Sequence, residues 1–153
     1  MTSIIRRLNT VFSGTPWYGQ PVLAVLESIH DVDVYQTPYN GGHSLIELLY
    51  HMINWTNFVL KRIEKDPVQD VRYFEQHDWI TIDPAKHTWE KGMEALKASQ
   101  QRLIDLLGQQ DDELLREIVD ERKYNYKFML HGLADHYIYH LGQMAYLKKW
   151  LEK

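Results

Sequence analysis

Apolar residues recur three or four positions apart along most of this chain, which is the spacing of one face of an α-helix. The clearest stretch runs over residues 45–63 and ends before Asp66 and Pro67. It starts at Ser44 with Glu47 three positions later, a capping-box pattern in which side chains and backbone amides bond reciprocally. The pattern therefore predicts a helix of about five turns that begins next to Ser44.

The same periodicity predicts other helices at about residues 3–12, 21–29, 84–107, 111–119 and 127–151. Asp83 followed by Pro84 is typical of a helix start with proline in the first helical position. Residues 68–82 are long for a simple connection, and long loops are often functional. No run alternates cleanly between apolar and polar residues. We expect an all-α four-helix bundle with a long crossover and one or two short extra helices.

Length and composition narrow the class of protein further. A chain of 153 residues suits one hydrophobic core, so we expect a single domain over residues 1–153. The formal net charge of −4 argues against nucleic acid as a partner, since its binders carry basic surfaces. No segment looks like a secretory signal or a membrane span, which predicts a cytoplasmic protein without a membrane partner. The absence of cysteine excludes disulfides, thiolate metal sites and cysteine nucleophiles.

Histidines are frequent, with 8 in the chain, and three of them suggest a metal site. His136 and His140 stand at i and i+4 on the final predicted helix, so both rings lie on one face. Two such imidazoles can hold one ion at about 2.0–2.1 Å. His51 lies on the corresponding flank of the 45–63 helix, and bundles commonly build metal sites from facing helices. The spacing alone is a weak signal, because chance gives about 0.4 such pairs. The alternative to a metal site is that His136 and His140 are simply two hydrogen-bonded, partly exposed histidines.

Two longer segments carry a resemblance to a known family. They resemble the two signature regions of the DinB/YfiT-like superfamily of four-helix bundles, and their sequences are GGHSLIELLYHMINW and LHGLADHYIYHLGQMAYLKKW. The resemblance implies that His51, His136 and His140 bind a divalent metal. Gly142-Gln143 and the loop at residues 16–19 also fit the family pattern. The resemblance further implies that the protein is a homodimer. It also implies an activity, either that of a metal-dependent hydrolase or that of a transferase that uses low-molecular-weight thiols.

Three neutral imidazoles leave the ion dipositive with an open coordination position, as in catalytic sites. Zinc and nickel both suit imidazole ligands and are the expected metals, with iron and manganese as alternatives. The substrate would be a small molecule. If it is a thiol, it must come from outside, because the chain contains no cysteine.

Glu47, Gln143 and Asp78 are the candidates for a further catalytic role. Glu47 lies one turn before His51, although its place in the capping box favours a structural role. Gln143 follows His140 by three residues and either hydrogen-bonds a ligand ring or lines a helix contact. Asp78 lies in the 68–82 segment, which can fold over the open coordination position.

Other residues near these segments have weaker cases. His77, beside Asp78 and Trp79, is the rival fourth ligand, although a surface role is favoured for a loop histidine. Glu121 is a further candidate for a carboxylate base. Besides His77, the remaining histidines share no helix face with the three candidates: His30, His43, His87 and His131. A non-catalytic metal-binding or stress-response module that acts as a homodimer is the alternative function. A structural dimer with a vestigial site is a third reading, and the intact histidines weigh against it.

Overall fold

The computed structural model describes residues 1–38, 41–66 and 70–152. These residues form six α-helices and one short 3-10 helix, and their only extended pairing is an isolated bridge between Ile118 and Asn125. The α-helices are α1 (Thr2–Phe12), α2 (Val22–Glu27), α3 (Leu45–Ile63), α4 (Val71–Gln76), α5 (Trp89–Gly108) and α6 (Tyr126–Leu151). The 3-10 helix η1 spans Leu114–Arg116. The predicted all-α class is confirmed.

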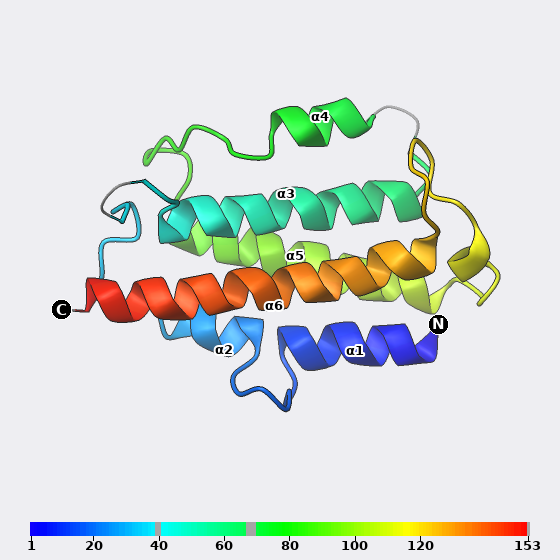
Figure 1. Cartoon of the computed structure of the whole chain (residues 1–153), viewed down its shortest axis with the longest axis horizontal. Helices are drawn as coiled ribbons and strands as arrows, with labels where there is room; N and C mark the ends of the chain where they lie inside the picture. The colour runs from blue at the N-terminus through cyan, green and yellow to red at the C-terminus, as the bar shows by residue number, and fades with distance from the viewer. Residues whose placement is uncertain (39–40, 67–69, 153) are drawn as a thin grey trace.

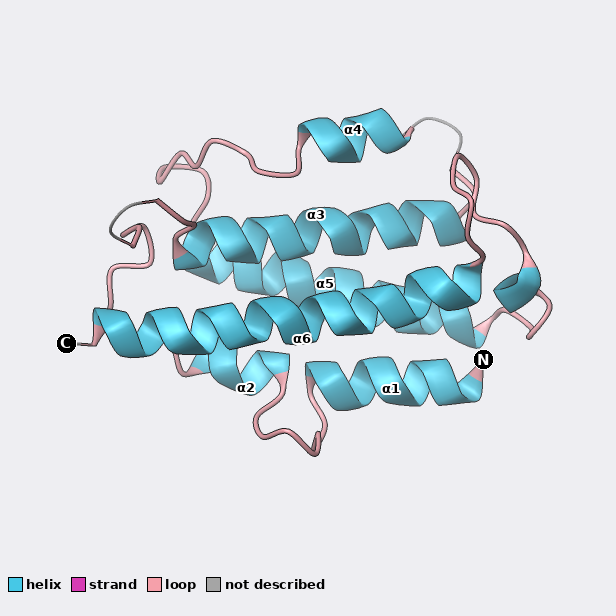
Figure 2. Cartoon of the chain, viewed as in Figure 1, coloured by secondary structure: helices cyan, strands magenta, loops and turns pink. Residues whose placement is uncertain are grey.

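The long helices form a bundle in which α3 packs against both α5 and α6 (Figure 1). Helices α1 and α2 lie end to end along the other side of α6, and α4 lies outside α3. Figure 2 shows the long connection that leads from α4 back to the start of α5. None of the described helices has both the length and the apolar character needed to cross a membrane.

The starts of the helices follow from their capping residues. Ser44 caps α3 as expected: its backbone N–H donates to Glu47 Oε2 at 2.7 Å, and its hydroxyl accepts from the Glu47 backbone. The predicted start of α5 at Asp83-Pro84 is wrong. There the chain forms a turn, in which the N–H of His87 donates to the Asp83 carbonyl at 2.7 Å. Thr88 is the true cap, because its hydroxyl accepts from the Lys91 N–H.

Two other expectations about local structure also change. The predicted helix over residues 111–119 shrinks to η1, because the backbone after it turns back on itself. Val119 N–H donates to the Tyr124 carbonyl and Tyr126 N–H donates to the Glu117 carbonyl, which replaces helical bonding. The 68–82 connection contains α4, capped by the Asp70 side chain. Its first two residues, 68 and 69, lie outside the described residues.

A buried polar contact fixes how α6 is rotated in the bundle. The Tyr137 side chain is fully buried, and its hydroxyl lies 2.7 Å from Thr56 Oγ1 on α3. The same hydroxyl donates to Gln100 Oε1 on α5 at 3.2 Å. Burial raises the pKa of Tyr137, so the phenol remains protonated and able to donate. This contact joins three helices and sets the direction of the neighbouring residue, His136.

Candidate metal centre

His51 from α3 and His136 and His140 from α6 converge at one point between the two helices. One nitrogen from each ring lies within 4.8 Å of the others, and the Nε2 atoms of His51 and His136 are 2.9 Å apart. Two nitrogens bound to one ion at about 2.05 Å lie roughly 2.9 Å apart at a right angle and roughly 3.3 Å apart at a tetrahedral angle. The spacing of the His51 and His136 nitrogens therefore fits a single metal ion, and the His140 nitrogen lies close enough to join them after a small adjustment.

Two of the three rings are held by hydrogen bonds on the side away from this point. His51 Nδ1 lies 3.0 Å from the Asp78 carbonyl oxygen and 3.1 Å from the Asp78 carboxylate. His140 Nδ1 lies 2.7 Å from the Gln143 amide oxygen. Oxygen acceptors at both Nδ1 atoms place the ring protons there, so each Nε2 presents a lone pair. This tautomer leaves Nε2 free to bind a metal ion.

The surroundings of the rings keep them neutral. Burial lowers the pKa of both His51 and His140. Burial, and then repulsion from His140 and His51, lowers the pKa of His136 to about 3. Metal ions bind the neutral ring, so protons compete only weakly at pH 7. Within the described residues, Nδ1 of His136 is buried without a hydrogen-bond partner, so this ring is oriented by packing and by the contact of its Nε2 with His51.

The connection before α5 folds over one side of the centre, as the sequence suggested that it can. The Trp79 ring stacks on the His51 ring, with centroids 4.0 Å apart and planes within 9°. His43 stacks with the same indole at 3.4 Å. The part played by His43 was not expected from the sequence, because no spacing rule links it to a tryptophan 36 positions away.

The three candidates for a catalytic role have definite places in the structure. Both the backbone N–H and the hydroxyl of Ser44 donate to Glu47 Oε2, which is the favoured capping role. Gln143 hydrogen-bonds a ring of the cluster rather than lining a helix contact alone. The Asp78 carboxylate also accepts from Trp55 Nε1 at 2.6 Å, so it is committed to holding His51 in place.

The two weaker candidates lie apart from the cluster. His77 is exposed, and its Nδ1 bonds to the Tyr73 carbonyl at 2.7 Å. The Glu121 carboxylate accepts from Arg62 at 3.1 Å and from the Val71 N–H at 2.9 Å. Arg62 is eleven residues beyond His51 on α3, about 16 Å along the helix. Glu121 therefore ties α3 to α4 at the far end of the bundle.

Two mainly apolar cavities flank the centre. One of about 440 Å³ is bordered by Gln143 and His43 and lined by side chains that include Tyr146, Leu147 and Trp150. The other, of about 200 Å³, contains His136 in its lining, together with Trp55, Phe58, Gly132 and Leu133. The smaller cavity touches the His136 ring, and the larger one touches Gln143, which hydrogen-bonds His140. They offer space for the apolar part of a small molecule beside the histidines.

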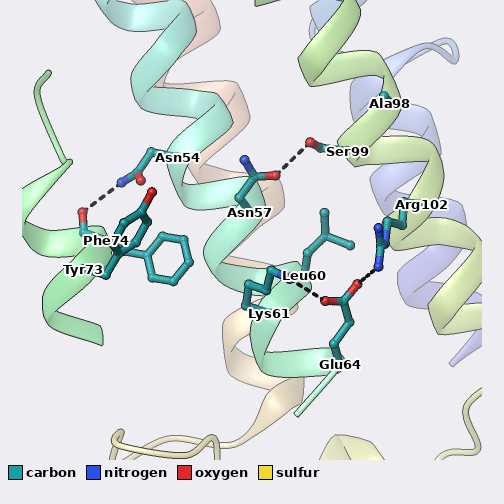
Figure 3. Close-up of a pocket in the computed structure, with 10 residues that line it drawn as sticks. All are labelled: Asn54, Asn57, Leu60, Lys61, Glu64, Tyr73, Phe74, Ala98, Ser99 and Arg102. Carbon is teal, nitrogen blue, oxygen red and sulfur yellow. Dashed lines mark hydrogen bonds and ion pairs between the residues drawn. The ribbon is translucent and has the colours of Figure 1, made fainter. Parts of the chain in front are cut away.

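A polar hollow of about 400 Å³ lies between α3, α4 and α5, and Figure 3 shows its lining. Lys61 Nζ pairs with Glu64 at 3.0 Å, and Arg102 pairs with the same carboxylate. The cations in this hollow are therefore already neutralised, and none of the three histidines lines it. The histidine cluster remains the better candidate for chemistry.

The structure is a helical bundle in which three histidines from two facing helices form a group that could hold a metal ion. The model of the DinB superfamily matches residues 19–144. Because the match covers most of the sequence, this chain belongs to the DinB superfamily. Comparison with curated proteins and with solved structures found no match.

Proposed function

We propose that this protein binds a divalent metal ion, zinc or nickel, through His51, His136 and His140. We further propose that it acts on a small molecule as a metal-dependent hydrolase or a thiol S-transferase. The observation that supports this proposal is the convergence of three neutral imidazoles, two of them oriented from behind by Asp78 and Gln143. Membership of the DinB superfamily is in keeping with it.

The chain contributes binding, orientation and shielding to this chemistry. When bound to three neutral imidazoles, a divalent ion supplies Lewis acidity and an acidified water or thiol. Asp78 and Gln143 keep the ring protons on Nδ1. Trp79 covers the His51 face and restricts water there. The cavity beside Gln143 accommodates an apolar group of the substrate. A thiol would have to enter with the substrate, since the chain has no cysteine.

A non-catalytic metal-binding module is the second candidate, and a specific observation favours it. The three carboxylates suggested as general bases are all engaged in hydrogen bonds, and Glu121 also lies apart from the cluster. Glu47 is bonded to Ser44, and Asp78 is bonded to His51 and Trp55. A hydrolase would therefore need its proton acceptor from the substrate or from solvent.

Metal content tests the site directly. Tag-free protein is dialysed against zinc or nickel and analysed for bound metal, together with the variant His136→Ala/His140→Ala. The matched control is His30→Ala/His77→Ala, which also removes two histidines, both of them exposed. We expect about one ion per chain in the parent and in the control, and almost none in the cluster variant. Equal metal content in all three proteins would refute the three-histidine site.

Activity then separates the two candidate functions. The metal-loaded protein is screened for conjugation of small thiols to electrophiles and for hydrolysis of amides and esters. Turnover that disappears when a chelator removes the metal, and returns when metal is restored, supports the enzyme. Turnover that survives metal removal would reject the metal-dependent mechanism. Bound metal without turnover of any of these substrates would favour the non-catalytic module.

A further inference from the structure

The larger apolar cavity beside the histidine cluster lies where the C-terminal part of α6 meets the connection that precedes α3 (Figure 1). Its residues from α6 are at positions 143, 146, 147 and 150, which lie on one face of the helix. This face extends for about 10 Å along the helix axis. The volume of about 440 Å³ is typical of a small-molecule site. The cavity can therefore take a group about as long as two fused aromatic rings.

The lining of this cavity is uncharged. None of the described residues that line it is Lys, Arg, Asp or Glu. Two charged side chains close by in the sequence are engaged elsewhere, since Lys148 donates to Ser28 Oγ at 3.1 Å and Glu47 accepts from Ser44. A charged group that entered the cavity would lose its hydration without gaining a partner. The net charge of −4 further disfavours anions, so the cavity selects for an uncharged group.

Gln143 lies at the end of the cavity next to the histidine cluster, and it has hydrogen-bond donors to offer. Its Oε1 accepts from His140 Nδ1 at 2.7 Å. Because the amide group is planar, this bond also fixes the direction of Nε2. Within residues 1–38, 41–66 and 70–152, no acceptor takes the Nε2 hydrogens. An acceptor oxygen on a bound molecule can therefore do so.

His43 also lines the cavity, and it is separated from the cluster by one indole ring. The Trp79 ring lies 3.4 Å from His43 and 4.0 Å from His51, with all planes within 9°. Two rings stacked so closely on one indole must lie on its opposite faces. Nδ1 of His43 is 4.0 Å from Glu47 Oε1, which is beyond hydrogen-bond distance. The half-exposed His43 ring can therefore donate to a bound molecule.

We propose that this cavity is the substrate pocket, and that it takes an uncharged aromatic group that carries a carbonyl. The aromatic group lies along α6 against Tyr146 and Trp150, because ring-to-ring contacts add to the gain from burial. The carbonyl oxygen accepts hydrogen bonds from Gln143 and His43. This orientation puts the carbonyl carbon at the end nearest the histidine cluster, where hydrolysis or thiol transfer needs it. The inference rests on the proposed function, because it names the substrate, but binding to the cavity requires no metal.

Two matched probes test the class of ligand on the metal-free protein. The first is 6-propionyl-2-dimethylaminonaphthalene, an uncharged two-ring ketone whose emission moves to longer wavelength when its carbonyl accepts hydrogen bonds. The second is 6-dimethylamino-2-naphthoate, which has the same rings and ends in a carboxylate at neutral pH. We expect saturable binding of the ketone to one site per chain. The naphthoate should bind about tenfold or more weakly than the ketone.

A pair of variants on α6 tests the location of the bound ketone. Tyr146→Ala should weaken binding about fivefold, because it removes a ring that lines the cavity. Phe128→Ala is the matched control, since Phe128 is also an exposed aromatic residue of α6 but lines the smaller cavity. Its effect on the affinity should be below about twofold.

The emission of the bound ketone tests the two hydrogen bonds. His43→Phe removes the N–H donor and keeps a ring against Trp79, and Gln143→Leu removes the amide. The ketone bound to the double variant should emit at shorter wavelength than in the parent. His77→Phe replaces an exposed histidine outside the cavity and should leave the emission unchanged.

The outcomes that would overturn the proposal are equal affinity for the two probes, lack of saturable binding, equal weakening by Tyr146→Ala and Phe128→Ala, or unchanged emission in the double variant. The comparison of the probes uses the parent protein, so it does not depend on the folding of any variant. Loss of the three-histidine site in the metal-content assay would leave all these binding results unchanged. Failure of the pocket and failure of the proposed metal chemistry are therefore distinguishable.

Discussion

Replacing Asp78 with asparagine removes a negative charge from behind His51 and leaves the carbonyl of residue 78 in place as an acceptor. The carboxylate oxygen lies 3.1 Å from His51 Nδ1, and an ion on the opposite ring nitrogen lies roughly 4 Å further away. At about 7 Å, the attraction between a dipositive ion and one negative charge is about 1 kcal/mol in water-like surroundings and about 5 kcal/mol at an effective dielectric constant of 20. The Asp78 side chain is 36% exposed, which favours the lower value.

We therefore expect Asp78→Asn to weaken metal binding about tenfold, which is about 1.4 kcal/mol and agrees with the usual effect of losing a ligand-orienting partner. The assay is a competitive titration of zinc against a chromophoric chelator at pH 7.5 and low salt. Asp105→Asn removes an equal charge from an exposed position on α5 and serves as the control, with an expected change below twofold. Unchanged affinity in Asp78→Asn, alongside loss of binding in His51→Ala, would refute this account of the carboxylate.

Three further predictions concern stability, each measured by urea unfolding of the metal-free protein. Tyr137→Phe should cost about 1–3 kcal/mol, because it breaks the buried contacts with α3 and α5, whereas Tyr139→Phe on the surface should change little. Gly92→Ala should also destabilise the protein by about 1–3 kcal/mol, since the added Cβ would lie 2.6 Å from Leu49 Cδ2. A Cβ added at Gly108 would have no neighbour within 4 Å, so Gly108→Ala should be neutral or stabilising. Because burial lowers the pKa of the three clustered histidines, the unfolded chain binds more protons than the folded chain below pH 6.5. The free energy of unfolding should therefore fall towards pH 5, by up to about 1.4 kcal/mol per pH unit for each extra proton that the unfolded chain binds. Removing the cluster should flatten this dependence.

Local patterns in the chain predicted the long helices well. The 45–63 helix and its capping box agree with the structure because both depend on neighbours within one or two turns. The start of α5 was misplaced because two capping residues, Asp83 and Thr88, lie close together and compete. Thr88 is followed by Trp89, which is buried against the core, and this tertiary contact favours the later start.

The pairing of His136 with His140 also followed from the sequence, because helical spacing alone puts both rings on one face. The contribution of His51 needed an assumption about which helices face each other, and it was strengthened by the resemblance to the DinB/YfiT-like family. The structure shows the three rings together because Tyr137 fixes the rotation of α6 against α3. No local rule specifies that rotation.

Helical periodicity, capping and the lack of cysteine were enough to define an all-α chain with a histidine pair and no thiol chemistry of its own. Each of these properties depends on residues a few positions apart or on composition. The contacts of Asp78 and Trp79 with His51, and the stack with His43, depend on how the connection before α5 folds back over α3. Those contacts join residues some 27 to 36 positions apart, and only the packing of the bundle brings them within hydrogen-bonding or stacking distance.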